Sequence, residues 1–208
     1  MPSTSIISVT SASAASVPIA VSNPRVVALV EKIDNNTETL TSMTAHFVQT
    51  KELALSTQPI VMAGDFLFMK DKGFKFSFDE EHDLILFLTK EKVVTISHKA
   101  KTANQADIKK RHNRYALKLL SQKIKSLTKY FDVTVDENTV DSKTQYHLTL
   151  NPAKRRLKKR FTSIEIWVNH DHLIHRVKLT LRDGDSYDVA LSDIKTNDDI
   201  DAALFDMT

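Results

Sequence analysis

The stretch Ile60-Val61-Met62-Ala63-Gly64-Asp65-Phe66-Leu67-Phe68-Met69 is almost wholly apolar, and it follows directly after Pro59. Close behind it, in residues 74–78, three phenylalanines alternate with Lys75 and Ser77. Such alternation is typical of a strand with one face in water, whereas a strand that is apolar throughout is covered on both faces. The pair predicts an antiparallel sheet in which one strand is buried between two layers or lines a dry cavity.

More strands are predicted on both sides of this pair, because short alternating or apolar segments are separated by polar turns. They are residues 44–51, 84–89, 93–98, 131–135, 146–150, 161–168, 173–181 and 187–194. Short turns at 169–171 and 182–185 favour antiparallel pairing of consecutive strands in a single domain.

Two segments show the helical spacing of apolar residues. The first begins at Pro24 and ends near Asp34. The second is predicted from about Gln105 to Lys129, after a polar loop at 99–107. Its apolar stripe consists of Ala116, Leu120, Ile124, Leu127 and Phe131. The two helices are expected to cover one side of the sheet, which gives an α+β fold.

Composition excludes several classes of site. The chain has 208 residues, enough for one domain with its own core, and a net charge of +3, which does not by itself indicate a nucleic-acid partner. The absence of cysteine excludes disulfides, thiol catalysis and cysteine-ligated zinc. No apolar run reaches the roughly 18 residues that span a bilayer. Motifs of nucleophile elbows, phosphate loops and zinc proteases are also absent, so we expect no enzyme and no cofactor.

The first 23 residues differ from the rest of the chain. They are uncharged, rich in Ser, Ala and Val, and include Ala12-Ser13-Ala14, which is similar to a signal-peptidase site. A basic start and a clear apolar segment, which a secretory signal requires, do not precede that site. We interpret residues 1–23 as a disordered linker or the remnant of a signal peptide, and residues 24–208 as one domain.

Several local patterns occur in a fixed order along residues 25–207. Residues 43–50 contain an F-x-Q core, and residues 64–76 combine a glycine, an aromatic strand, a basic residue and a second aromatic strand. Residues 164–177 form a hairpin-like pattern, and 187–205 end in I-D-x-x-x-F. In this order they resemble the periplasmic outer-membrane lipoprotein carriers of the LolA type.

The resemblance implies an unclosed antiparallel β half-barrel covered by a helical lid around a hydrophobic cavity. Such carriers take the acyl chains of a lipoprotein or another lipid from an inner-membrane donor complex and pass them to an outer-membrane acceptor. For this chain we therefore expect a monomer in the periplasm with no nucleic-acid partner. The cavity residues implied are Phe47, Phe66, Phe68, Phe74 and Phe76.

The family's basic residue near the cavity mouth falls on Lys70. In the family this residue is typically an arginine that hydrogen-bonds the lid and holds it closed. A lysine is a point charge rather than a planar fork, so weaker lid closure is expected. Asp71 stands where the family has proline, and 90–92 replace a D-G turn. These departures indicate a divergent branch and leave open another acylated cargo, such as a glycolipid or a polyene lipid.

A dense basic segment lies between two predicted strands. It comprises Lys154, Arg155, Arg156, Lys158, Lys159 and Arg160. The simplest interpretation of this segment is a solvated hairpin tip. The second interpretation is that it docks to acidic head groups or to an acidic partner. Together with the basic residues of the long helix, the segment supports an alternative function: a non-enzymatic module that binds anionic surfaces or nucleic acid. The interleaved aromatic residues of single-strand binders are absent from it.

His170, His172 and His175 form the densest histidine group in the chain. Zinc needs three or four convergent ligands, and no carboxylate at a suitable spacing completes this set. The group therefore predicts a polar turn rather than a metal site.

Overall fold

The structure is a computed structural model that describes residues 19–20, 23–89, 92–97, 99–100, 102–107, 123–140 and 143–206. Its strands are β1 (Ile19–Ala20), β2 (Ser42–Glu52), β3 (Ile60–Met69), β4 (Gly73–Phe78), β5 (Ile85–Leu88), β6 (Lys92–Ser97), β7 (Thr102–Asp107), β8 (Phe131–Val140), β9 (Lys143–Pro152), β10 (Phe161–Val168), β11 (Ile174–Leu181) and β12 (Ser186–Thr196). Its helices are α1 (Pro24–Thr39), α3 (Ile124–Leu127), α4 (Arg155–Lys158) and the 3-10 helix η1 (Ala202–Phe205). No helix in these ranges is long and apolar enough to cross a membrane.

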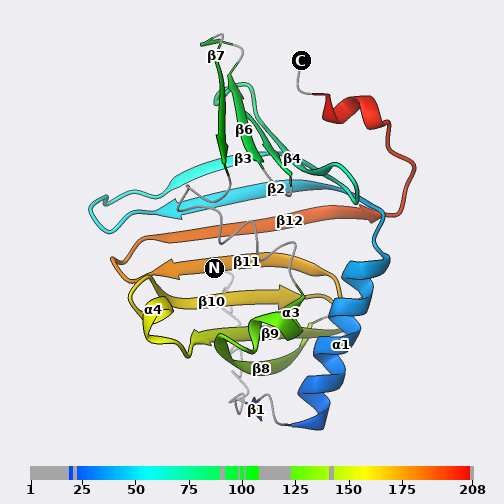
Figure 1. Cartoon of the computed structure of the whole chain (residues 1–208), viewed down its shortest axis with the longest axis vertical. Helices are drawn as coiled ribbons and strands as arrows, with labels where there is room; N and C mark the ends of the chain where they lie inside the picture. The colour runs from blue at the N-terminus through cyan, green and yellow to red at the C-terminus, as the bar shows by residue number, and fades with distance from the viewer. Residues whose placement is uncertain are drawn as a thin grey trace, which may run out of the picture.

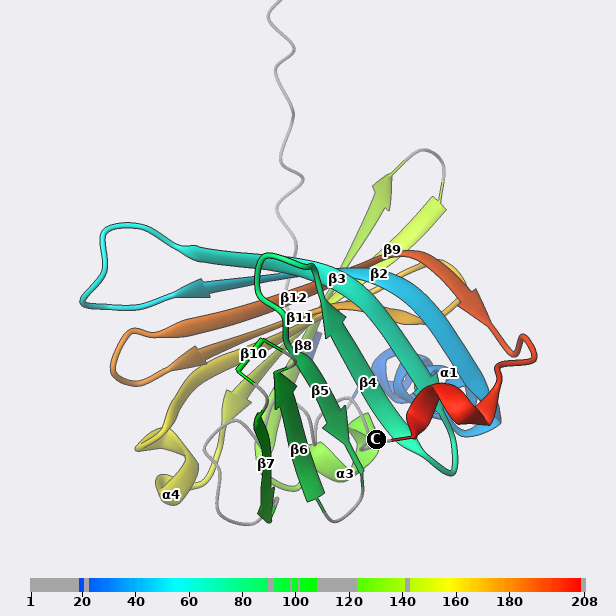
Figure 2. The same cartoon turned by 90° about the horizontal axis from the view of Figure 1, so that it is seen from above.

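These strands form one antiparallel sheet in the order β1-β8-β9-β10-β11-β12-β2-β3-β4-β5-β6-β7. The end strands β1 and β7 do not pair with each other in the described part of the chain, so the sheet is an unclosed half-barrel. Figure 2 shows the sheet curving around α3, with α1 to one side of it. Figure 1 shows β12 and β2 in the middle of the molecule, where they join its two halves. The predicted α+β half-barrel is confirmed.

Helix α1 begins where the sequence provides a capping signal. The Asn23 side chain accepts a hydrogen bond from the Arg25 N–H at 2.9 Å, and Pro24 occupies the first helical position, where its missing N–H costs nothing. Val26, Leu29, Val30 and Ile33 recur at helical spacing and are buried against the sheet. The helix continues to Thr39, five residues beyond the predicted end.

One core fills the space between the helices and strands β8–β11. We call it the helix-covered core. Its buried members are Val26, Leu29, Val30, Ile33, Ile124, Leu127, Phe131, Val133, Val135, Leu148, Leu150, Phe161, Ile164, Ile166, Val168, Val177 and Leu179. Burying one such side chain stabilises the fold by roughly 1.5–3 kcal/mol, so this core supplies most of the driving force for folding.

Asp34 joins α1 to α3. Its carboxylate, which is 5% exposed, accepts hydrogen bonds from the backbone N–H groups of Ile124 at 2.6 Å and Lys125 at 3.0 Å. Burial raises the pKa of Asp34, and the two N–H donors act in the opposite direction. The first N–H groups of a helix have no partner within it, so Asp34 fixes the place where α3 begins.

The structure differs from the sequence prediction around residues 99–129. The prediction of a loop at 99–107 is wrong for residues 102–107, because Thr102–Asp107 form β7 at the edge of the sheet. The predicted helix from Gln105 is also wrong at its start, and residues 108–122, including Ala116 and Leu120, lie outside the described residues. The helix that follows is the short α3, after which Phe131 opens β8. Of the predicted linker at 1–23, the described Ile19–Ala20 pair with β8.

Candidate functional site

A second core lies on the concave face of β2, β3 and β4. We call it the phenylalanine cluster, and it consists of Phe47, Phe66, Phe68, Phe74, Phe76 and Phe78. Cross-strand pairing places Phe66 opposite Phe76 and Phe68 opposite Phe74, so alternate residues of both strands point to one face. The structure thus brings together all five phenylalanines predicted from the sequence and adds Phe78.

The rings of the cluster pack against one another. Phe47 meets the rings of Phe76 and Phe78 edge-on, with centroids 5.2 and 5.1 Å apart. The centroids of Phe66 and Phe76, and of Phe68 and Phe74, are each 5.0 Å apart. Such pairs add about 0.5–1.5 kcal/mol each to the burial term. Phe47, Phe66 and Phe76 are buried, whereas the other three rings are half-buried and leave apolar surface on the concave face.

Gly64 makes the contact between Phe47 and Phe78 possible. It lies opposite both residues in the sheet, on the strand between them. A Cβ atom at this position would stand 2.0 Å from the carbonyl oxygen of Ser77 on β4. Only glycine therefore allows β4 to approach β3 this closely.

A small hollow lies where the phenylalanine cluster meets the helix-covered core. Its apolar lining consists of Phe66, Phe76, Ile174, Val177, Val189 and Leu191. The hollow has room for about one water molecule, which is far less than an alkyl chain occupies. Filling this face with an acyl chain therefore requires the surrounding side chains to move apart.

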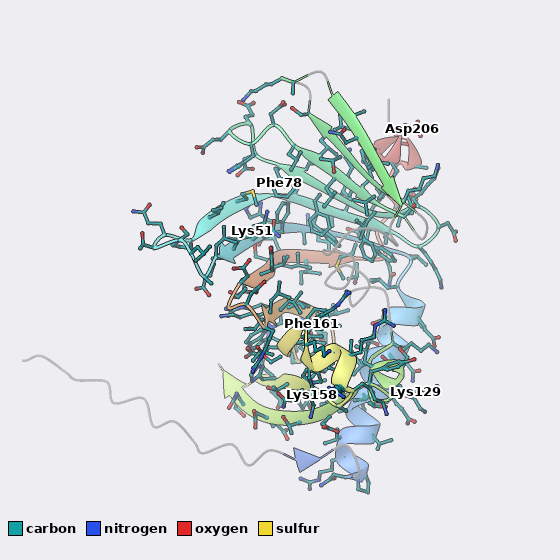
Figure 3. All side chains as sticks on the ribbon, turned by 60° about the vertical axis from the view of Figure 1, so that its left-hand side comes forward. Lys51, Phe78, Lys129, Lys158, Phe161 and Asp206 are labelled. Carbon is teal, nitrogen blue, oxygen red and sulfur yellow. The ribbon has the colours of Figure 1, made fainter. Side chains whose placement is uncertain are left out.

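Lys51 lies at the rim of the same face. It is opposite Tyr187 of β12 and two residues beyond Gln49, on the side of β2 that carries Phe47. Burial lowers the pKa of Lys51, which forms no ion pair with the described residues. Figure 3 shows Lys51 and Phe78 in the upper part of the molecule, whereas Phe161, Lys158 and Lys129 lie in the lower part.

Lys70 lies at the turn between β3 and β4, where it contacts the end of α1. Its Nζ donates a hydrogen bond to the carbonyl oxygen of Glu38 at 2.8 Å, and its backbone N–H donates to Thr41 at 2.9 Å. The last carbonyls of a helix lack partners and attract cations. The Glu38 carboxylate in turn pairs with Lys123, which precedes α3. Lys70 is thus linked through one residue to both described helices on the concave side.

The basic segment Lys154–Arg160 is built around α4, in the connection between β9 and β10. Leu157 packs against the helix-covered core, while the basic side chains are exposed. Lys154, Arg155, Arg156, Lys158 and Lys159 form no ion pair with the described residues. Figure 1 shows α4 at the same end of the sheet as the β2–β3 and β11–β12 turns. These five side chains therefore form an exposed cationic projection.

The three clustered histidines do not converge. His170 pairs with Asp171 at 3.2 Å, the ring of His172 stacks on Tyr146, and His175 lines the hollow. No group of three or more metal-ligating side chains gathers within the described part of the chain.

Comparison with known proteins places this geometry in a family. The model of the outer membrane lipoprotein carrier protein LolA matches residues 38–208. The chain belongs to the LolA family. Proteins of this family are carriers or binding proteins rather than enzymes. No curated protein matches the sequence.

Solved structures resemble this chain at low sequence identity. The Mycobacterium tuberculosis lipoprotein LppX matches with a TM-score of 0.55 and 12% identity, covering 86% of this chain and 98% of that chain. The LolA superfamily protein NE2245 from Nitrosomonas europaea matches with a TM-score of 0.43 and 10% identity, over 85% of this chain and 96% of that chain. At this identity, the likeness to LppX supports the half-barrel fold alone.

Sequence reasoning missed two parts of this LolA-like site. Phe78 belongs to the same alternation as Phe74 and Phe76, so the sequence pattern is sufficient to place it among the cavity residues. The histidine pattern predicts a polar turn for His175, whereas in the structure it lies in β11, two residues before buried Val177. The signal that could have found it is its position within a strand whose next inward residues are apolar.

Proposed function

We propose that this LolA-family protein is a non-enzymatic carrier of acylated cargo in the periplasm. It binds the acyl chains of a lipoprotein or another lipid on its concave face. It receives them from an inner-membrane donor complex and delivers them towards an outer-membrane acceptor.

The observation that carries this proposal is the phenylalanine cluster. Phe68, Phe74 and Phe78 remain half-buried on a concave face that lies beside the closed helix-covered core. Each CH₂ group that an acyl chain removes from water contributes roughly 0.8 kcal/mol, so several carbons on this surface outweigh the cost of parting the rings. The family match supports lipoprotein or lipid as the cargo class.

The proposal is tested by purifying the exported chain without detergent and extracting it for lipid mass spectrometry. We expect a stoichiometric acylated species, and its mass distinguishes a lipoprotein from a glycolipid or polyene lipid. Phe68→Ser combined with Phe74→Ser should reduce binding of a fluorescent fatty-acid probe several-fold, while Val48→Ser, on the opposite face of β2, should not. An empty protein that also fails to bind the probe would overturn the carrier function.

We also propose that Lys70 keeps the concave face closed by holding the end of α1. Removing its hydrogen bond to Glu38 leaves a helix-terminal carbonyl without this partner. It also loosens Glu38, the residue whose carboxylate pairs with Lys123 before α3. Lys70→Leu should therefore release a bound fatty-acid probe faster than the unmodified chain. Lys72→Leu is the matched control, because Lys72 lies in the same turn and makes no side-chain bond to described residues. Equal release rates for both variants would remove Lys70 from the mechanism.

The basic segment supports docking of the carrier to an anionic surface. Each Lys or Arg near an anionic membrane contributes about 1 kcal/mol, and the effect falls within a Debye length. Lys158→Glu combined with Lys159→Glu should abolish sedimentation with phosphatidylglycerol vesicles, whereas Lys92→Glu combined with Lys195→Glu should not. Nucleic-acid binding that weakens steeply with salt, without any lipid binding, would instead favour the alternative function.

A further inference from the structure

His175 lies on the concave face, because it is two residues from buried Val177 on β11, and it stands at a β-bulge in the pairing of β10 with β11. Val168 pairs with Ile174, and the next residue back on β10, Trp167, pairs with Arg176. His175 is therefore the extra residue of the bulge, without a counterpart on β10. Bulges redirect a side chain and are frequent beside functional sites.

His175 lines the hollow at the junction of the two cores. The other polar residue at that hollow is Arg176, and its guanidinium lies on the opposite face. There it stacks on Trp167 and pairs with Asp188 at 2.6 Å. The imidazole of His175 is thus the polar side-chain group presented to a space otherwise lined by apolar side chains.

One nitrogen of this imidazole has no partner within the described part of the chain. Nε2 of His175 is buried and makes no hydrogen bond to any described residue. Leaving such a group unsatisfied is unfavourable, because it loses its hydrogen bonds to water, so buried polar atoms usually have a partner. Burial, together with the charge of Arg176, lowers the pKa of His175, which favours the neutral ring. A neutral imidazole offers a donor or an acceptor according to its tautomer.

We propose that His175 is a cargo-recognition residue that hydrogen-bonds an oxygen of the acyl cargo, of the kind found in a hydroxyl, carboxyl or carboxyl-ester group. This inference rests on the proposed carrier function and specifies the cargo that the concave face prefers. An unsubstituted alkyl segment in the hollow leaves Nε2 unpaired. An oxygen-bearing group satisfies Nε2, so the site binds cargo with such a group more tightly than cargo without it.

The test compares two ligands of equal chain length, hexadecan-1-ol and 1-chlorohexadecane, which differ in hydrogen-bonding ability. Both are delivered from cyclodextrin, and their affinities are measured by displacement of a fluorescent fatty-acid probe. His175→Phe should lower the ratio of alcohol affinity to chloride affinity by about tenfold relative to the unmodified chain. His175→Gln should retain part of the ratio. His46→Phe is the control, because His46 lies on the outer face of β2 beside Asp65.

A second measurement on the unmodified chain does not depend on the folding of a variant. The imidazole nitrogen resonances of His175, observed by NMR with ¹⁵N-labelled histidine, should move when hexadecan-1-ol is added. They should respond much less to 1-chlorohexadecane.

The outcomes separate this inference from the function on which it rests. If both ligands bind, but the affinity ratio is the same in His175→Phe and the Nε2 resonance is equal with either ligand, recognition by His175 is overturned and the carrier function stands. If neither ligand nor the probe binds, both proposals fail.

Discussion

The helix-covered core and the phenylalanine cluster lie on the same face of one sheet but are built differently. Aliphatic side chains fill the first, and α1 and α3 close it, so that Leu148, Leu150 and Val168 have no exposed surface. Aromatic rings fill the second and pack chiefly against one another, and half of them remain partly exposed. The contrast indicates that one half of the half-barrel provides stability, while the other retains apolar surface for a ligand.

The largest effect expected from this contrast is a difference in stability between the halves. Leu148→Ala should lower the free energy of unfolding by about 2–5 kcal/mol, because a fully buried side chain leaves a cavity. Phe74→Ala, which removes a half-buried ring, should cost about 1–2 kcal/mol and also weaken binding of a fatty-acid probe. Urea unfolding with an unchanged m-value measures both losses. Equal losses would mean that the phenylalanine half is ordinary core.

A smaller effect is expected at the joint that closes the helix-covered half. Asp34→Ala leaves the first N–H groups of α3 without their acceptor and should cost about 1–3 kcal/mol. Hydrogen exchange should accelerate at Ile124 and Lys125 more than in β9. Asp132→Ala, at an exposed position of β8, is the control and should change neither quantity. Unaltered exchange in α3 would show that the packing of Ile124 and Leu127 is sufficient to hold it.

The smallest effect expected is a dependence of stability on pH that arises at the boundary between the halves. Burial lowers the pKa of both His172 and His175 in the folded chain. Below the ordinary value of about 6.5, the unfolded chain therefore binds protons that the folded chain does not, and stability is lost as the pH falls through that value. His175→Phe should reduce the loss of unfolding free energy between pH 7.5 and pH 5.5. A loss of the same size in the variant would assign the effect to His172 or to other groups.

The sequence predicted the parts of the fold that depend on local alternation. The strand at 60–69 was predicted with the bounds that the structure gives it, and β4 within one residue. Asn23 and Pro24 mark the start of α1 through local chemistry alone. The phenylalanines expected on one face are indeed neighbours, because the two strands are consecutive and their pairing follows from a short turn.

The prediction failed where long-range pairing decides the structure. Residues 102–107 read as a loop because an edge strand needs no apolar face, and only their hydrogen bonds to β6 define them as β7. The stripe through Ile124, Leu127 and Phe131 correctly marked residues that are buried together. It could not show that the chain changes from helix to strand after Tyr130, because the four-residue step from Leu127 to Phe131 is compatible with one face of a helix and with one face of a strand.

His175 shows a further limit. Period-two alternation from Val177 places it on the concave face, but not at a bulge, where the pairing of β10 with β11 shifts by one residue. A bulge is a property of two strands together, so neither sequence segment reveals it alone.

The position of Gly64 has a consequence for protein engineering. Phe68, Phe74 and Phe78 can be exchanged for smaller or larger residues to suit a different cargo, because their rings border a partly open face. Gly64 allows no such exchange, since any side chain there would collide with the backbone of β4. A redesigned carrier can therefore vary the half-buried part of its binding face, but it must keep this one close approach of β3 to β4.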